Sequence, residues 1–137
     1  MYVAKLMSLH NWNLEGGIHM MVVESLSRTE KIGDITYLYN YRIIKSYISM
    51  EVEDDLVSSQ AYGIEVERQD IVNGVVVNIE RDSIESISPQ RHKVHNLLRL
   101  LYDNAVSPIH LVEVLGEYVD TYIMDFDINV RNASTLN

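Results

Sequence analysis

Cysteine is absent from the 137-residue sequence, which excludes disulfides, thiolate nucleophiles and cysteine-based zinc sites. Long hydrophobic runs are absent too. No stretch reaches the roughly 18 apolar residues of a transmembrane helix, so no membrane contact is expected. The apolar run Leu6–Trp12 is too short and too interrupted for the core of a signal peptide. We therefore expect a cytoplasmic protein.

Basic residues are scarce: 11 Lys and Arg stand against 20 Asp and Glu, for a net charge of −9. Non-specific binding to DNA or RNA needs clustered positive charge, so no nucleic-acid partner is expected. This charge balance suits a soluble protein and is compatible with a basic protein partner.

The length is typical of one domain, and 47% hydrophobic residues are enough for a buried core. Residues 1–20 are expected to be a loose or short-helical extension, because apolar residues recur there at helical spacing before Gly16-Gly17 interrupts them. The compact domain is predicted over residues 21–127, followed by a flexible C-terminal tail over residues 128–137.

Alternation of apolar and polar residues predicts β structure from Met21 to about Asp82. A turn at Gly33-Asp34 would place Leu26 opposite Tyr41 and Arg28 opposite Tyr39. The long strand after it is predicted to end near Ile48, and the polar residues 51–60 are expected to form a loop.

Asn73-Gly74 is the strongest hairpin signal in the chain. A plain two-residue turn there would set Arg68 opposite Ile79, an unfavourable pair that a bulge or a longer loop would correct. In the strand that follows, Val75, Val77 and Ile79 are expected to face inward.

The last third of the chain is predicted to be helical. Ser88-Pro89 and Ser107-Pro108 are both typical of helix starts. The first helix should end near Asn104. The residues expected to be buried are Val94, Leu97, Leu98 and Leu101 in the first helix and Leu111, Val112, Leu115, Val119 and Tyr122 in the second. The fold class is therefore α+β: an antiparallel four-stranded sheet of two hairpins, followed by two C-terminal helices packed on one face.

Motifs that carry chemistry are weak. His92, His95 and His110 lack the spacing of a metal site, and the acidic group Glu51, Glu53, Asp54 and Asp55 is most simply a solvated loop. Ser88 and Ser107 are better explained as helix caps than as nucleophiles. We assign no catalytic residue, no metal ligand and no cofactor. The acidic residues Glu113, Glu117 and Asp120 of the second helix argue against a DNA-reading helix-turn-helix.

The most unusual feature is a strand in which Tyr37, Tyr39 and Tyr41 alternate, so that all three project from one face. Aromatic residues are enriched at protein interfaces, which makes these three the candidate partner-binding residues. The alternative is that the helices cover this face and that the tyrosines belong to the core or its edge.

The segments Tyr62–Val66, Ser107–Leu111 and Gly116–Val119 resemble a family of small uncharacterised proteins of anaerobic spore-forming bacteria, over roughly residues 21–125. The resemblance implies a domain of unknown function in a bacterial cytoplasm. It implies no catalytic residue, cofactor or partner.

Three functions remain open. The first is a non-enzymatic protein-interaction or regulatory module. The second is a small acidic inhibitor that mimics nucleic acid, which would require an array of carboxylates on one face. The third is an enzyme whose site is assembled only in space. A homodimer is compatible with an open sheet edge, since most homo-oligomers are two-fold dimers.

Overall fold

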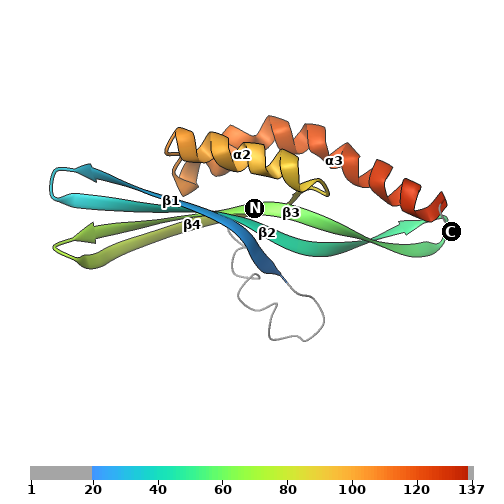
Figure 1. Ribbon diagram of the computed structural model, residues 1–137, viewed down its shortest axis with the longest axis horizontal. Helices are drawn as coiled ribbons and strands as arrows, with labels where there is room; N and C mark the ends of the chain where they lie inside the picture. The colour runs from blue at the N-terminus through green and yellow to red at the C-terminus, as the bar shows by residue number, and fades with distance from the viewer. Residues whose placement is uncertain (1–19, 136–137) are drawn as a thin grey trace.

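Four long antiparallel strands form one sheet in the order β1-β2-β3-β4 in the computed structural model, which describes residues 20–135. Two helices follow and lie on one face of the sheet (Figure 1). The elements are β1 (Met21–Ile32), β2 (Ile35–Val52), β3 (Asp55–Val72), β4 (Val75–Ser88), α2 (Arg91–Asp103), the 3-10 turn η1 (Pro108–His110) and α3 (Leu111–Thr135). The predicted α+β class is confirmed. The extension expected over residues 1–20 lies, except for its last residue, outside the described residues.

The first and last turns have the predicted geometry. Gly33 adopts a positive φ of 60°, and the register places Leu26 opposite Tyr41 and Arg28 opposite Tyr39, as expected. At the other turn Asn73 and Gly74 both have positive φ, the conformation that a type I′ turn requires. A register shift next to Asp70 sets Arg68 opposite Glu80, so the predicted bulge is present.

The prediction of a loop over residues 51–60 is wrong. β2 and β3 continue through this region and are joined by a two-residue turn at Glu53 and Asp54, which both have positive φ. Residues 46–61 thus form a two-stranded arm beyond the ends of β1 and β4 (Figure 1). Its polar composition suggested a loop because most of the arm faces solvent. The sheet is therefore a meander of three hairpins, not two.

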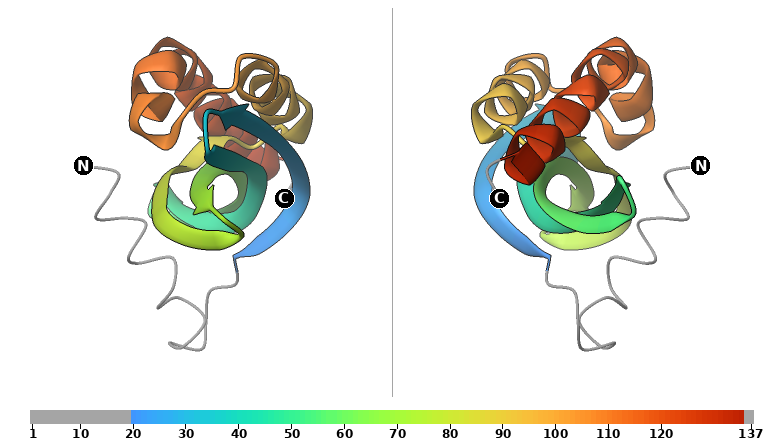
Figure 2. Two further views of the ribbon diagram at one scale, coloured as in Figure 1. Left: turned by 90° about the vertical axis from the view of Figure 1, so that its left-hand side faces the viewer. Right: turned by 90° about the vertical axis from the view of Figure 1, so that its right-hand side faces the viewer.

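The sheet bends at Gly63, where the backbones of β3 and β4 approach each other closely. Tyr62 pairs with Ser88 and Ile64 pairs with Ile84, so β4 carries extra residues at this point. A Cβ at position 63 would overlap the carbonyl oxygens of Ile84 and Glu85, so only glycine fits there. Seen along its long axis, the sheet is strongly coiled beneath the helices (Figure 2).

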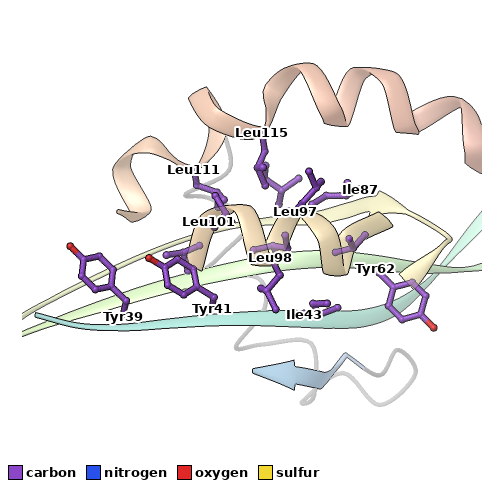
Figure 3. Close-up of a cluster of buried hydrophobic side chains, with 14 residues drawn as sticks. Tyr39, Tyr41, Ile43, Tyr62, Ile87, Leu97, Leu98, Leu101, Leu111 and Leu115 are labelled. Carbon is purple, nitrogen blue, oxygen red and sulfur yellow. The ribbon is translucent and has the colours of Figure 1, made fainter. Parts of the chain in front are cut away.

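The core lies between the sheet and the two helices. α2 buries Val94, Leu97, Leu98 and Leu101, and α3 buries Leu111 and Leu115, as predicted (Figure 3). They pack on sheet residues that include Ile43, Ile64 and Ile84. Val119 and Tyr122 are partly buried against this core, but Val112 is exposed, contrary to the prediction.

The boundaries of the helices differ from the prediction at both ends of the region. α2 starts at Arg91 because Ser88 still belongs to β4; the Ser88 hydroxyl accepts a hydrogen bond from the Gln90 N–H (3.1 Å) rather than capping the helix. The end at Asp103, with Asn104 as the C-cap, agrees with the prediction. α3 runs to Thr135, so residues 128–135, expected in a tail, are helical. The extension contacts the arm, since the Asn129 side chain donates a hydrogen bond to the Ser59 hydroxyl (3.0 Å).

Candidate interaction surface

The tyrosine strand belongs mainly to the core. Tyr41 is fully buried and Tyr39 is 8% exposed, and their rings are stacked with centroids 6.1 Å apart (Figure 3). The Tyr41 hydroxyl donates a hydrogen bond to the Val106 carbonyl (2.9 Å), and burial, followed by the neighbouring Tyr39, raises the pKa of Tyr41. Tyr37 is partly exposed beneath the Arg68 guanidinium. Tyr39 and Tyr41 therefore form no exposed binding face, because α2 and the α2–α3 connection cover them.

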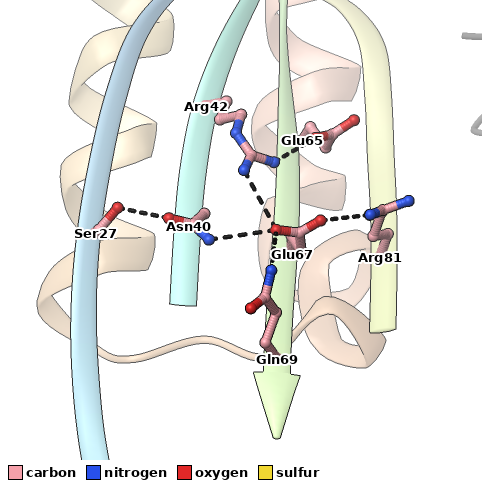
Figure 4. A network of polar contacts seen from close by, with 7 residues as sticks. All are labelled: Ser27, Asn40, Arg42, Glu65, Glu67, Gln69 and Arg81. Carbon is pink, nitrogen blue, oxygen red and sulfur yellow. Dashed lines mark hydrogen bonds and ion pairs between the residues drawn. The ribbon is translucent and has the colours of Figure 1, made fainter. Parts of the chain in front are cut away.

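The sheet face away from the helices holds a charged network centred on Glu67 (Figure 4). The Glu67 carboxylate accepts hydrogen bonds from Arg42, Arg81, Asn40 and Gln69, and Arg42 also pairs with Glu65. Burial by itself would raise the pKa of Glu67, but Arg81 and Arg42 outweigh burial and hold the pKa below its usual range. Two arginines and two glutamates cancel in charge, so this network joins three strands and offers little net field to a ligand.

The remaining acidic and histidine side chains are dispersed. His95 contacts Glu24 of β1 (2.6 Å) and His110 contacts Glu113 (3.2 Å), so these two histidines serve separate local contacts. Among the residues that the structure describes, no three potential metal ligands lie together. The acidic group at residues 51–55 surrounds the turn of the arm. The part of the chain covered by the structure also holds no helix that is long and apolar enough to cross a bilayer.

Many of the exposed apolar side chains lie on β4 and α3. Val75, Val77 and Ile79 are 61%, 61% and 46% exposed, so their predicted inward orientation is wrong. This end of the sheet extends beyond the helices, and nothing in the described chain covers it (Figure 1). β4 is also an edge strand, so its outer backbone groups have no neighbouring strand to pair with.

A second apolar row runs along η1 and α3, which we call the outer stripe: Ile109 in η1 and Val112, Gly116, Val119 and Ile123 in α3. The spacing of 3, 4, 3 and 4 residues keeps these positions on one side of a helix. Ile109, Val112 and Ile123 are 75%, 37% and 60% exposed, whereas Val119 also packs partly against the core. The sequence contained this signal, because α3 has more apolar residues than one buried face needs. Two members of the outer stripe, Val112 and Val119, alternate with the buried row and are therefore predicted from the sequence to lie in the core.

The outer stripe meets β4 at a shallow hollow of about 370 Å³, lined by Ile79, Glu80, Arg81, Asp82, Pro108 and Ile109. Burial raises the pKa of Asp82, and the hydrogen bond that its carboxylate accepts from the Ser83 N–H (2.8 Å) offsets only part of this effect. The hollow thus combines the apolar residues Ile79, Pro108 and Ile109 with three ionisable side chains, of which Asp82 is easier to protonate than usual. Its apolar part suits an apolar side chain.

Comparison with known proteins places the chain in a family but gives it no activity. Residues 20–121 match DUF6514, a family of unknown function, and the chain belongs to this family. The expected resemblance to a family of unknown function is confirmed over nearly the span predicted for it. No curated protein matches the chain, and no solved structure does.

Proposed function

We propose that the protein is a non-enzymatic interaction module that binds a protein partner through the outer stripe of α3 and the adjoining edge of β4. The observation that supports this function is the juxtaposition of the two features: exposed Ile109 lines the same hollow as exposed Ile79. Exposed apolar patches of this kind mark interaction sites in soluble proteins. A bacterial cytoplasmic setting remains part of the proposal.

The distribution of charge favours this function over a nucleic-acid mimic. Several sheet acids, among them Glu65, Glu67 and Asp70, are paired with arginines of the same chain. A mimic of nucleic acid needs free carboxylates spaced like phosphates. Free surface acids on α3, such as Glu117 and Asp120, instead border the apolar stripe, an arrangement typical of the polar rim around an interface.

A photo-cross-linking experiment tests the proposal. The photoreactive residue p-benzoyl-phenylalanine is placed at Val112, at Val77 or, as a control, at Leu56, which is 81% exposed on the distant arm. Irradiation in native lysate should give a discrete adduct from Val112 and Val77 and none from Leu56. Equal labelling from all three positions, or no adduct from any, would contradict the proposal. The mass of the adduct reveals whether the partner is another protein or a second copy of the 15.8 kDa chain.

A further inference from the structure

The outer stripe lies on the flank of α3 that points away from α2. On the other flank, Asp125 forms an ion pair with Lys93 of α2 (Nζ to Oδ2, 2.6 Å). Gly116 and Asp125 are nine residues apart, which at about 100° per residue places them on opposite sides of the helix. The stripe therefore faces outward beside β4, where a neighbouring molecule can reach it.

Gly116 is the centre of the stripe, and no close packing among the described residues requires a glycine there. Glycine inside a helix costs about 1 kcal/mol relative to alanine. A Cβ added at Gly116 would meet nothing within 4 Å, so no neighbour in the described chain requires the missing side chain. At helix–helix contacts, small residues let two backbones approach closely, which gives this glycine a purpose in an assembly.

The stripe is nearly the same in both directions from Gly116. Ile109 stands seven residues before it and Ile123 seven residues after it, with Val112 and Val119 between. A two-fold interface requires such self-complementarity, because each residue that contacts a second position is itself contacted by that position in the other copy. In an antiparallel pair centred on Gly116, Ile123 of each copy lies beside Ile109 of the other.

We propose that a second copy of this chain docks antiparallel on the outer stripe of α3, so that each Ile123 fills the hollow beside β4 of the other copy. This inference rests on the proposed function and names the partner of the same surface. A stable dimer buries about 800 Å² per partner. Exposed Ile79 of β4, which lines the hollow, adds to the area of the helix seam.

The salt dependence of binding distinguishes a second copy of the chain from a basic protein partner. Glu113, Glu117 and Asp120 flank the stripe, and each copy carries a net charge of −9, so two copies repel one another. Salt screens repulsion between exposed charges. Self-association should therefore become tighter as the salt concentration rises, whereas binding of a basic partner would become weaker.

Sedimentation of the full chain with substitutions in α3 tests the seam. The chain should sediment as a dimer, and Ile123→Asp should make it monomeric. Ile128→Asp is the matched control, since Ile128 is similarly exposed (57%) on the same helix but outside the stripe, and it should leave the dimer intact. Gly116→Ala should weaken dimerisation about tenfold or more while raising the unfolding temperature of the dilute monomer. A chain that stays monomeric up to about 1 mM, or equal effects of Ile123→Asp and Ile128→Asp, would overturn the proposal.

Thiol cross-linking tests the antiparallel direction. Because the sequence has no cysteine, only the introduced thiols can react. The double variant Ile109→Cys with Ile123→Cys should be joined into covalent dimers by a short bis-maleimide, while each single variant should not. Dimers from the single variants would indicate a parallel contact and refute this arrangement. A monomeric chain whose photo-adduct contains another protein would leave the proposed function standing and remove the second copy as its partner.

Discussion

α2 and α3 lie on the same sheet, yet their outer surfaces differ. α2 has one apolar row, buried against the sheet, and its other surface carries residues such as Arg91, His92 and Arg99. α3 has a buried row and, in addition, the outer stripe, whose Val112 and Ile123 are exposed. The contrast teaches that amphipathic spacing reports how much apolar surface a helix has, but not whether its own chain covers that surface. The excess on α3 is the feature that points to a partner.

The largest expected effect is a difference in stability between a substitution in the buried row of α2 and one in the outer stripe of α3. Leu98→Ala in α2 removes a fully buried side chain and should lower the free energy of unfolding by about 2–5 kcal/mol. Ile123→Ala on the outer stripe should change the stability of the dilute monomer by no more than about 0.5 kcal/mol. Urea denaturation of both variants at low protein concentration measures this difference. A loss at Ile123 similar to that at Leu98 would show that the stripe is covered within the monomer.

The connection between the helices gives the next largest effect. Tyr41→Phe removes the hydrogen bond to the Val106 carbonyl and keeps the ring that packs on Tyr39. Leaving this partly buried carbonyl without its donor should cost about 1–2 kcal/mol. Thermal unfolding checks the value, with Tyr47→Phe on the exposed arm as a control that should be neutral. An unchanged unfolding temperature for Tyr41→Phe would mean that water replaces the donor.

A smaller effect of opposite sign is expected at Gly116. In the dilute monomer, Gly116→Ala should raise the free energy of unfolding by about 0.5–1 kcal/mol, because the Cβ enters open space and the helix gains propensity. Chemical denaturation at a concentration well below dimerisation is the measurement. A loss of stability there would show that the chain itself fills the space beside Gly116, and would blur the difference between α2 and α3.

The smallest expected effect concerns Asp82 in the hollow below α3, and it depends on pH. In the unfolded chain Asp82 titrates near its ordinary pKa of 3.8, whereas burial raises the pKa in the folded protein. Below the unfolded value both states are protonated and burial has no charge penalty; as pH rises through the folded pKa, the carboxylate must be buried and stability falls. Asp82→Asn should therefore be more stable than the natural chain at pH 7, with the gain vanishing below about pH 4.

The comparison for this pH experiment is Glu67, whose pKa is shifted in the other direction. With a folded pKa below its unfolded value, Glu67 stabilises the protein above the unfolded pKa of about 4.5, and this contribution is lost as pH falls through the folded pKa. Glu67→Gln should accordingly destabilise the protein at pH 7 and matter less in acid. Similar pH profiles for both variants would contradict these opposite shifts.

Much of the fold could be predicted because its signals are local. The turn at Asn73-Gly74, the bulge beside it and the end of α2 near Asn104 depend on residues close in sequence. The errors arise where distant parts of the chain decide. Residues 51–60 form strands because each half of the arm pairs with the other. Ile79 is exposed because it pairs with Gln69 and lies with it on the sheet face away from the helices.

The class of the protein could be predicted from local patterns, because alternating strands before two amphipathic helices, without cysteine or a long apolar run, are typical of a small α+β domain. Its acidity likewise needs no structure. Which apolar residues are covered depends on how the strands and helices pack in three dimensions. Tyr39 and Tyr41, two of the three tyrosines predicted as candidate partner-binding residues, are buried, whereas Ile109, Val112 and Ile123 of the outer stripe are exposed. The physical reason is that burial depends on where the elements end and cross in space, and periodicity along the chain does not contain that information.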